Sequence, residues 1–363
     1  MKILHIVRQF YPMIGGLENY VFHLAKQQIN IGHEVTVLTL NKSFVNNSIY
    51  PNNELISKIN IIRISYFGSQ RYPIALSVLK HLKYYDIIHV HAIDFFADYL
   101  ALTKIFHKKK LIITTHGGFF HTKKNSFLKK IFFQSITRCT LKKYSAIIAC
   151  SSNDFNTFSK ISKNVTLINN GVDVEKYSRV SKKIENGTLV TIGRIDSHKG
   201  IDKLILTISK LIEKGINVKL EIVGPDSRNL IPHLHQIAIN SKVENIVKFV
   251  GKVEDVELTK IFSKAHLFIS ASTYEGFGIA AVEAMASGTL CILNNIPSFS
   301  EILGTNEFGR IVNFENIDEV VQNIESLLNM SETEYNVLSQ KARIYAENYN
   351  WNEISKKITN LYI

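Results

Sequence analysis

The chain contains little cysteine, and its cysteines are scattered. The 363 residues include Cys139, Cys150 and Cys291, whose odd number and irregular spacing argue against a disulfide framework or a zinc site. No apolar run approaches the roughly 20 residues of a membrane-spanning helix, and the opening stretch 1–7 is too short for a signal peptide. We therefore expect a protein of the reducing cytoplasm.

The sequence also lacks the patterns of a metal site. No Asp-x-Asp pair, a carboxylate pattern that can hold a divalent ion, occurs in the sequence. The thirteen histidines show no ligand spacing, and we interpret His89, His91 and His121 as structural. We expect neither a metal ion nor a cofactor.

Acidic residues are scarce in the first half of the chain. Residues 1–170 contain 22 Lys/Arg and 7 Asp/Glu, a balance of +15, whereas residues 171–363 contain 21 and 24, a balance of −3. This asymmetry points to a polyanionic partner for the first half, which could be nucleic acid, an anionic bilayer or a phosphorylated acceptor. A lysine-rich proteome would give the same composition without a partner.

The length and the alternation of apolar runs predict two α/β domains. The chain is too long for a single hydrophobic core, and its 45% hydrophobic content is sufficient to fill two cores. We predict doubly wound, Rossmann-like domains at 1–168 and 169–345 that face a cleft. The turn signal Asn170-Gly171 lies in a linker placed at 168–186. We expect residues 346–363 to form a helix that packs back toward the N-terminal domain.

Short β-branched runs separated by helix-length segments predict parallel sheets built from βαβ units. The predicted strands of the first domain are Ile3–Val7, Val35–Thr39, Ile59–Ile64, Ile87–His91, Leu111–Thr115 and Ala146–Cys150. Those of the second domain are Thr188–Ile192, Val218–Val223, Val247–Val250, Leu267–Ser270, Thr289–Leu293 and Gly309–Val312. We expect helices between the strands, and a helical stretch from Ser331 onward.

The segment 274–283, which reads YEGFGIAAVE, offers the strongest candidate site. A strand ends at Ser270, two glycines form a turn, and a helix of good formers begins at Ile279 after Gly278. The free N–H groups and the positive dipole end of such a helix attract an anion, and the glycines let a diphosphate approach the backbone.

Two carboxylates flank this anion site. Glu275 precedes the turn and Glu283 lies within the helix. Because the turn separates them, one carboxylate can face a sugar and the other a nucleoside. The alternative is a surface helix with incidental acidic residues.

Two cations follow the first strand of the second domain. Arg194 comes directly after Gly193, and Lys199 precedes Gly200. At a junction of strand, loop and helix they can clamp a diphosphate, Arg194 through its planar fork and Lys199 as a point charge. The alternative is a pair of solvated loop charges.

In the first domain, Gly15 and Gly16 follow the first strand and precede a helix expected from Leu17. Ligands of α/β domains bind at this position, beyond the carboxyl ends of the strands. The pair does not belong to a G-x-G-x-x-G motif, so NAD is not indicated. His116 ends another strand and can hydrogen-bond a sugar hydroxyl at the same cleft. A simple turn and a structural histidine are the alternatives.

Lysines alternate with aromatic residues in the segment 119–133. It can lie in a bilayer interface, with Phe in the acyl boundary and Lys123, Lys124, Lys129 and Lys130 on anionic head groups. A lipid-linked acceptor would then reach the site. A buried helix with a solvated lysine face is the alternative. Arginine is scarce here and no nucleic-acid motif accompanies it, so we expect no nucleic-acid partner.

Together these motifs resemble glycosyltransferase family 4, whose members share two facing Rossmann-like domains, the glycosyltransferase B fold. The resemblance spans nearly the whole chain and rests on Gly15-Gly16, Asp86–His91, Thr115-His116, Asn170–Asp173, Gly193-Arg194 with Lys199-Gly200, and Glu275–Glu283. Residues 7–18 and 115–122 are similar to α-mannosyltransferases that build exopolysaccharide repeat units from GDP-mannose and an undecaprenyl-diphosphate-linked oligosaccharide.

The resemblance implies a retaining hexosyltransferase with an acceptor domain at 1–168 and a donor domain at 169–345. It places Arg194 and Lys199 on the diphosphate and Glu283 on the ribose. The donor-binding residues that it implies are Gly15, Gly16, Arg194, Lys199, Gly224, Gly251, Gly278, Ile279 and Glu283, and the catalytic residues are His116 and Glu275. Pro225, which follows Gly224, departs from the Gly or Asp of many members.

We therefore expect transfer of α-mannose from GDP-mannose to a polyprenyl-diphosphate-linked oligosaccharide in surface polysaccharide synthesis. The expected location is the cytoplasm, peripheral on the inner face of the cell membrane. A UDP-sugar donor is the alternative within the family. A nucleotide-sugar epimerase and a non-catalytic nucleotide-sugar-binding subunit are alternatives of another class.

Overall fold

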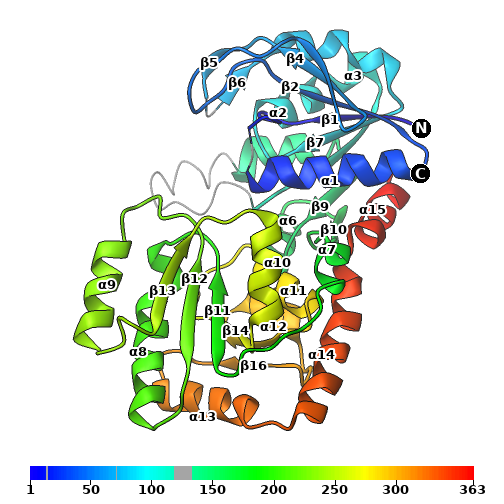
Figure 1. The fold of residues 1–363 in the computed structure, drawn as a ribbon. Helices are drawn as coiled ribbons and strands as arrows, with labels where there is room; N and C mark the ends of the chain where they lie inside the picture. Colours follow the sequence, from blue (N-terminus) through cyan, green and yellow to red (C-terminus); the bar gives the residue numbers. More distant parts are fainter. Residues whose placement is uncertain (14, 71, 118–132) are drawn as a thin grey trace. The chain divides into compact units, whose positions relative to one another are not determined.

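The computed structural model describes residues 1–13, 15–70, 72–117 and 133–363, drawn as a ribbon in Figure 1. They form two compact units. Unit 1 comprises Met1–Gly171 and Trp351–Ile363, and unit 2 comprises Val172–Asn350. Within these described residues, no helix combines the length and the apolar composition that crossing a bilayer requires.

Unit 1 contains an eight-stranded sheet in the order β10-β9-β8-β7-β1-β2-β4-β3. Its strands are β1 (Lys2–Ile6), β2 (Glu34–Leu40), β3 (Asn53–Ile56), β4 (Ile59–Ile64), β7 (Ile87–His91), β8 (Lys110–Thr114), β9 (Ala146–Ala149) and β10 (Val165–Leu167). Neighbouring strands are parallel except β3 and β4. Because the chain order reverses beside β1, the carboxyl ends of β1 and β7 form a topological switch point.

Helices cover both faces of this sheet. They are α1 (Gly16–Asn30), α2 (Phe95–Leu102), α3 (Lys104–His107), α5 (Arg138–Leu141), α6 (Ser152–Phe158) and α15 (Trp351–Asn360). Helices α1 and α15 pack against each other (Figure 1). Side chains alternate across a strand, so Ile3 and Val7 join the core that contains the inner residues of α1 and α15, whereas Leu4 and Ile6 join the core of the other face.

Trp351 anchors α15 within unit 1. Its indole packs edge-on against Tyr20, with 5.0 Å between ring centroids, and stacks on His23 at 5.6 Å. A Cβ at Gly171 would overlap the indole, so the chain can pass beneath this ring only as glycine. The sole tryptophan of the sequence thereby ties the C-terminal helix to the end of the first α/β unit.

Unit 2 contains a parallel six-stranded sheet in the order β13-β12-β11-β14-β15-β16, so its switch point lies between β11 and β14. The strands are β11 (Thr188–Ile192), β12 (Lys219–Val223), β13 (Val247–Gly251), β14 (Leu267–Ser270), β15 (Leu290–Asn294) and β16 (Gly309–Val312). The helices are α7 (Val174–Ser178), α8 (Ile201–Glu213), α9 (Ile231–Asn240), α10 (Asp255–Lys264), α11 (Ile279–Ala286), α12 (Pro297–Leu303), α13 (Ile317–Leu328) and α14 (Glu332–Ala346). One continuous hydrophobic core fills this unit.

The predicted strands are all present, with ends shifted by at most one residue. The expectation of helices between them is wrong in two places. Residues 41–58 contain β3, which pairs antiparallel with β4. Residues 65–86 contain a small hairpin, β5 (Phe67–Ser69) and β6 (Tyr72–Ile74), followed by 3-10 turns at Leu76–Lys80 and Leu82–Tyr84. The asparagines and the proline of 41–58, and Pro73 in 65–86, disfavour helix, because they compete with the backbone hydrogen bonding or break it.

Candidate active site

In unit 2 the predicted cations lie beside the switch point between β11 and β14. Gly193 directly follows β11, the exposed Arg194 comes next, and Lys199 ends a 3-10 turn before α8. The Lys199 Nζ lies 2.6 Å from Oε1 of Glu275, which follows β14, and the two side chains keep 19% and 17% of their surfaces exposed. Two residues that the sequence places 76 positions apart thus form one ion pair.

The Lys199 ammonium reaches back over the end of β11. A Cβ at Gly193 would lie 3.0 Å from Nζ, and the φ of 149° at this glycine is unfavourable for other residues. The ammonium and the Arg194 backbone therefore lie at the same edge of the sheet. Such an arrangement offers a positive site with one carboxylate as its counter-ion.

Three predicted glycines pack together where β11, β12 and β13 end. A Cβ at Gly224, where φ is 143°, would overlap the carbonyl oxygen of Gly193. The Gly224 amide donates to the carbonyl oxygen of Gly251 over 2.8 Å. Because these residues have no side chains, the backbone at this edge can approach a planar ligand closely.

Helix α11 begins where the sequence predicts. Gly278 precedes it with a φ of 108°, and a Cβ there would lie 2.9 Å from Ile302 and 3.0 Å from Phe299 of α12. The first amides of α11, beginning at Ile279, mark the positive end of the helix dipole.

Glu283 is partly buried on α11. Its Oε1 accepts a hydrogen bond from the Tyr177 hydroxyl over 3.0 Å. Burial raises the pKa of the Glu283 carboxyl to about 7, while the Tyr177 hydrogen bond and nearby Lys176 act in the opposite direction. This carboxyl therefore changes charge near neutral pH.

In unit 1 the glycine pair lies at the switch point between β1 and β7. Gly15 is the extended residue before α1, and a Cβ there would overlap the Glu18 carboxylate, whereas Gly16 borders open space. Arg8, which follows β1, pairs through Nε with Asp94 at 3.1 Å. Asp94 caps α2, and burial raises its pKa to about 6.

His116 follows β8 in a left-handed conformation, with a φ of 49°. Residues other than glycine rarely adopt this conformation, and it concentrates at functional sites. The Nε2 atom lies 3.1 Å from Nδ1 of His91, and Nδ1 lies 3.9 Å from the Cys150 sulfur. Burial lowers the pKa of the ring to about 3, so the imidazole is neutral at physiological pH.

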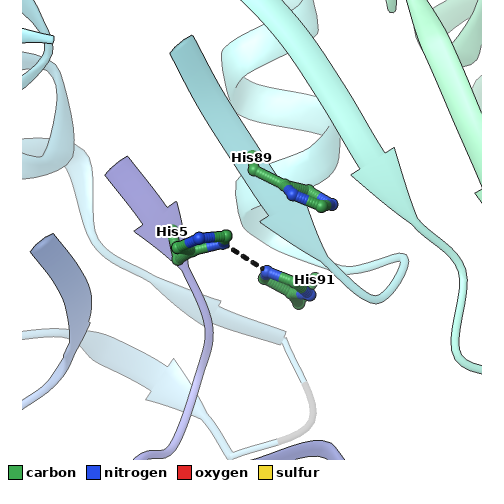
Figure 2. Close-up of side chains that lie close together, drawn as sticks. All are labelled: His5, His89 and His91. Carbon is green, nitrogen blue, oxygen red and sulfur yellow. Dashed lines mark hydrogen bonds between the residues drawn. The ribbon is translucent and has the colours of Figure 1, made fainter. Parts of the chain in front are cut away.

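Three further histidine rings lie together behind His116. Figure 2 shows His5 on β1 and His89 and His91 on β7, with a hydrogen bond between His5 and His91. One nitrogen from each ring lies within 4.8 Å of the others, so their number and spacing could hold a metal ion. Every ring nitrogen already has a hydrogen-bond partner, however. These contacts agree with a structural role for His89 and His91.

Comparison with known proteins identifies the family. Residues 14–176 match the model of Glycosyltransferase Family 4, and residues 173–345 match that of Glycosyl transferases group 1. The chain is 35% identical to the GDP-mannose:cellobiosyl-diphosphopolyprenol alpha-mannosyltransferase of Xanthomonas campestris, over 100% of this chain and 96% of that protein. The chain belongs to glycosyltransferase family 4.

Other similarities of this family 4 glycosyltransferase agree. It is 33% identical to the Komagataeibacter xylinus protein of the same name, over 100% of this chain and 93% of that protein. The crystal structure of a glycosyltransferase from Rickettsia africae superimposes with a TM-score of 0.77 at 23% identity, covering 99% and 97% of the two chains. The enzyme is thus a hexosyltransferase with the glycosyltransferase B fold of two Rossmann-like domains, as the sequence predicts.

The structure divides the predicted site residues between the units and adds others. Gly15, Gly16 and His116 belong to unit 1, whereas the other predicted residues that are described belong to unit 2. Lys123, Lys124, Lys129 and Lys130 lie outside the described residues. Local sequence patterns assign no site role to Tyr177, Arg8 or Asp94 in this glycosyltransferase, because their partners are distant along the chain.

Proposed function

We propose that this glycosyltransferase moves α-mannose from GDP-mannose to an oligosaccharide carried on a polyprenyl diphosphate, with retention at the anomeric carbon. The observation that carries the proposal is the full-length similarity to the Xanthomonas campestris enzyme, whose name states GDP-mannose and a cellobiosyl-diphosphopolyprenol. The charged residues at the strand ends of unit 2 supply a matching chemistry.

In this proposal Arg194 and Lys199 bind the donor diphosphate. Their two positive charges balance the diphosphate of a nucleotide sugar, and the amides that begin α11 add the positive end of a helix dipole. When the bond to the sugar breaks, one more negative charge develops on the leaving diphosphate. Cations and amides already in position stabilise this charge without reorganisation, so a metal ion is not required.

The nucleoside occupies the neighbouring strand ends. The Glu283 carboxylate accepts hydrogen bonds from the ribose hydroxyls, and Tyr177 orients it through its 3.0 Å hydrogen bond. The base lies against the backbone at Gly224 and Gly251, where no side chain obstructs it. The partial desolvation of Glu283 supports this role, because ligand hydroxyls can replace the hydration that its carboxyl has lost.

Residues of unit 1 have proposed roles of their own. His116 hydrogen-bonds a sugar hydroxyl, and Gly15 and Gly16 let the backbone approach the phosphates. Glu275 lies near the donor sugar. Transfer with retention follows when the leaving diphosphate oxygen takes the acceptor's proton on the face where the acceptor attacks. Catalysis then comes mainly from positioning and from charge stabilisation.

To reach a lipid-linked acceptor, unit 1 binds peripherally to an anionic membrane. Residues 99–153 contain 11 Lys/Arg and no Asp/Glu. At the end of α2 and on α3, Leu102, Ile105 and Phe106 keep 70%, 75% and 81% of their surfaces exposed. Apolar side chains surrounded by lysines suit a bilayer interface with anionic head groups.

Neighbouring lysine-bearing segments lie beside α3. The Lys104 ammonium donates to the carbonyl oxygen of Lys143, and the Lys109 ammonium donates to those of Lys83 and Tyr85 over 3.0 and 2.7 Å.

Co-sedimentation with vesicles that contain anionic lipid tests the α3 face, and binding should weaken in a Phe106→Asp variant. Equal binding of this variant and the unchanged protein would exclude the α3 face.

A donor panel tests the reaction itself. The protein is incubated with GDP-mannose, GDP-glucose, UDP-glucose or UDP-galactose and a synthetic polyprenyl-diphosphate-linked cellobiose, and lipid-linked products are analysed by mass spectrometry. We expect a trisaccharide from GDP-mannose, with an α-linkage by NMR. Transfer from a UDP-sugar alone would reassign the donor, and free sugar isomers formed without acceptor would replace the transferase by an epimerase.

A further inference from the structure

One buried hydrogen-bonded chain in unit 1 joins four histidines through a single glutamine. In one direction, Gln28 Oε1 lies 2.7 Å from His5 Nε2, His5 Nδ1 lies 2.9 Å from His91 Nε2, and His91 Nδ1 lies 3.1 Å from His116 Nε2. In the other direction, Gln28 Nε2 donates to the Tyr362 hydroxyl over 3.0 Å. That hydroxyl lies 2.6 Å from His89 Nδ1, and His89 Nε2 lies 2.7 Å from the Thr114 hydroxyl.

Strand alternation places these side chains on one face. His5 lies between Ile3 and Val7 along the chain, and the two flanking residues face the core that contains the inner residues of α1 and α15. The register of β1 with β7 sets His5 opposite His89. Gln28 on α1 is fully buried, and Tyr362 near the C-terminus keeps 3% of its surface exposed. The hydrogen-bonded chain therefore connects the three strands β1, β7 and β8, the covering helix α1 and the C-terminal segment.

Each ring in this chain carries one proton. Burial lowers the pKa of His5 to about 4 and that of His116 to about 3, and it also lowers those of His89 and His91 well below their usual range. A neutral imidazole has one N–H donor and one acceptor nitrogen. Fixing the donor on one ring therefore fixes it on the next.

The amide of Gln28 determines the direction of the hydrogen bonds along this chain. Its Oε1 can only accept, so His5 carries its proton on Nε2 and offers Nδ1 as an acceptor. His91 then donates from Nε2 to His5, and His116 donates from Nε2 to His91. The Nδ1 of His116 is left with its lone pair and only a distant thiol neighbour, Cys150 at 3.9 Å.

The second branch is consistent with the first. The Tyr362 hydroxyl accepts from Gln28 Nε2 and so donates its own proton to His89 Nδ1. His89 then donates from Nε2 to Thr114. Turning the amide by 180° would reverse every bond in both branches and would leave His116 with Nδ1–H.

We infer that Gln28 is a positioning residue that selects the Nε2–H tautomer of His116 through His5 and His91, and thereby presents the His116 Nδ1 lone pair to a hydroxyl of the donor sugar. The first part stands on the hydrogen-bonded chain alone. The sugar contact rests on the proposed function.

A metal ion is the competing explanation of this cluster. His5, His89 and His91 bring one nitrogen each within 4.8 Å of the others. Binding a cation there would require their lone pairs to replace hydrogen bonds of 2.6 to 2.9 Å. Stoichiometric zinc, copper, nickel or iron in the purified protein, retained by wild type and lost in His5→Gln, would overturn the inference.

The decisive measurement is ring 15N NMR of protein labelled at histidine. We expect His116 in the unchanged protein to show one protonated nitrogen, Nε2, and one unprotonated nitrogen, Nδ1. In Gln28→Leu both directions of the chain become available, and His116 should show a mixture of tautomers. The kcat/KM for mannosyl transfer should fall about two- to tenfold, the range for one neutral hydrogen bond.

Two further variants separate tautomer selection from simple damage to the core. Gln28→Glu keeps an oxygen facing His5, so His116 should retain Nε2–H and kcat/KM should recover. Because a carboxylate accepts from Tyr362 instead of donating to it, His89 should switch to Nδ1–H in this variant. Val21→Ala removes buried volume from the same helix face. It should lower the melting temperature without changing either tautomer.

Each outcome has one meaning. Nδ1–H on His116 in the unchanged protein, or an unaltered His116 tautomer in Gln28→Leu, overturns the inference. A mixture of tautomers in Gln28→Leu that is restored in Gln28→Glu supports it. If the tautomers respond but kcat/KM does not, Gln28 still selects the tautomer, and the sugar contact assigned to His116 under the proposed function is wrong.

Discussion

Donor binding should depend on pH through the partly buried Glu283 carboxyl. Burial raises the pKa of Glu283 to about 7 in the ligand-free protein. If the ribose hydroxyls donate to this group, the donor binds the ionised form and releases the proton. The apparent Kd for the donor is then multiplied by one plus the ratio of the proton concentration to the acid dissociation constant of Glu283. This factor is about 11 at pH 6 and about 1.1 at pH 8, so GDP-mannose should bind about tenfold more tightly at the higher pH.

The assay is calorimetric titration with GDP-mannose in the absence of acceptor, at constant ionic strength, from pH 6 to pH 8. The intact nucleotide sugar is preferable to GDP, because a terminal phosphate titrates near pH 6 and would add its own pH dependence. Calorimetry in buffers of different ionisation enthalpy also counts the released proton directly.

Glu283→Gln should abolish the pH dependence and weaken binding at pH 8 by about tenfold or more, the loss of a hydrogen bond to a charged group. Glu213→Gln on the exposed end of α8 is the matched control and should retain the full pH dependence. A flat profile in the unchanged protein, or an equal slope in Glu283→Gln, would refute the assignment of Glu283 to the ribose.

The same carboxyl affects stability with the opposite sign. Its folded pKa lies above the unfolded value of 4.5, so the folded protein binds more protons between these values and loses stability as pH rises from about 4.5 to about 7. The contribution of Glu283 to ligand-free stability should therefore change with pH in the direction opposite to donor binding.

Three further substitutions test other parts of the structure. Arg194→Ala should lower turnover more than tenfold with little change in melting temperature, because Arg194 is exposed; near-normal turnover excludes it from the diphosphate site. Gly224→Ala should destabilise unit 2 by about 3 kcal/mol or more in urea unfolding, because the added carbon overlaps the Gly193 carbonyl at an unfavourable φ. The control Gly215→Ala, also at positive φ but in open space, should cost only about 1 kcal/mol. The folded pKa of His5 lies below its unfolded value, so the contribution of this ring to the free energy of unfolding should fall as pH decreases from 6.5 to about 4, by on the order of 1 kcal/mol per pH unit. In urea unfolding, His5→Gln should reduce the stability that is lost between pH 7.5 and pH 5.

The strands were predictable because their signal is local. Runs such as Ile87–His91 and Thr188–Ile192 contain β-branched residues that suit buried parallel strands, and both have the predicted bounds. The segments 41–58 and 65–86 were not predictable by the same alternation, because nothing in βαβ periodicity indicates an antiparallel edge strand or a hairpin. Proline and asparagine were the available signals.

The backbone of the candidate site was predictable where a turn or a close approach requires a special conformation, whereas its tertiary contacts were much less predictable. Gly278 and Gly224 have positive φ values that a strand-to-helix turn or a close approach demands. By contrast, the partner of Glu283 is 106 positions away, and Gln28 reaches Tyr362 across 334 positions. His89 and His91 had no interpretable spacing, because their partners come from β1, from the end of β8 and from the C-terminus.

The ion pair between Lys199 and Glu275 makes a last prediction that separates binding from chemistry. At 2.6 Å the Glu275 carboxylate holds the Lys199 ammonium and also opposes an arriving diphosphate. Glu275→Gln should therefore bind GDP about three- to tenfold more tightly, an effect of about 1 kcal/mol for one partly exposed charge pair. Turnover with GDP-mannose should fall, because the proposed contact of the carboxylate with the donor sugar is lost. Lys199→Gln should weaken GDP binding instead. If Glu275→Gln weakens GDP binding as well, Glu275 positions Lys199 for the diphosphate rather than competing with the diphosphate for Lys199. Glu275 would then support the cation and would not contact the sugar.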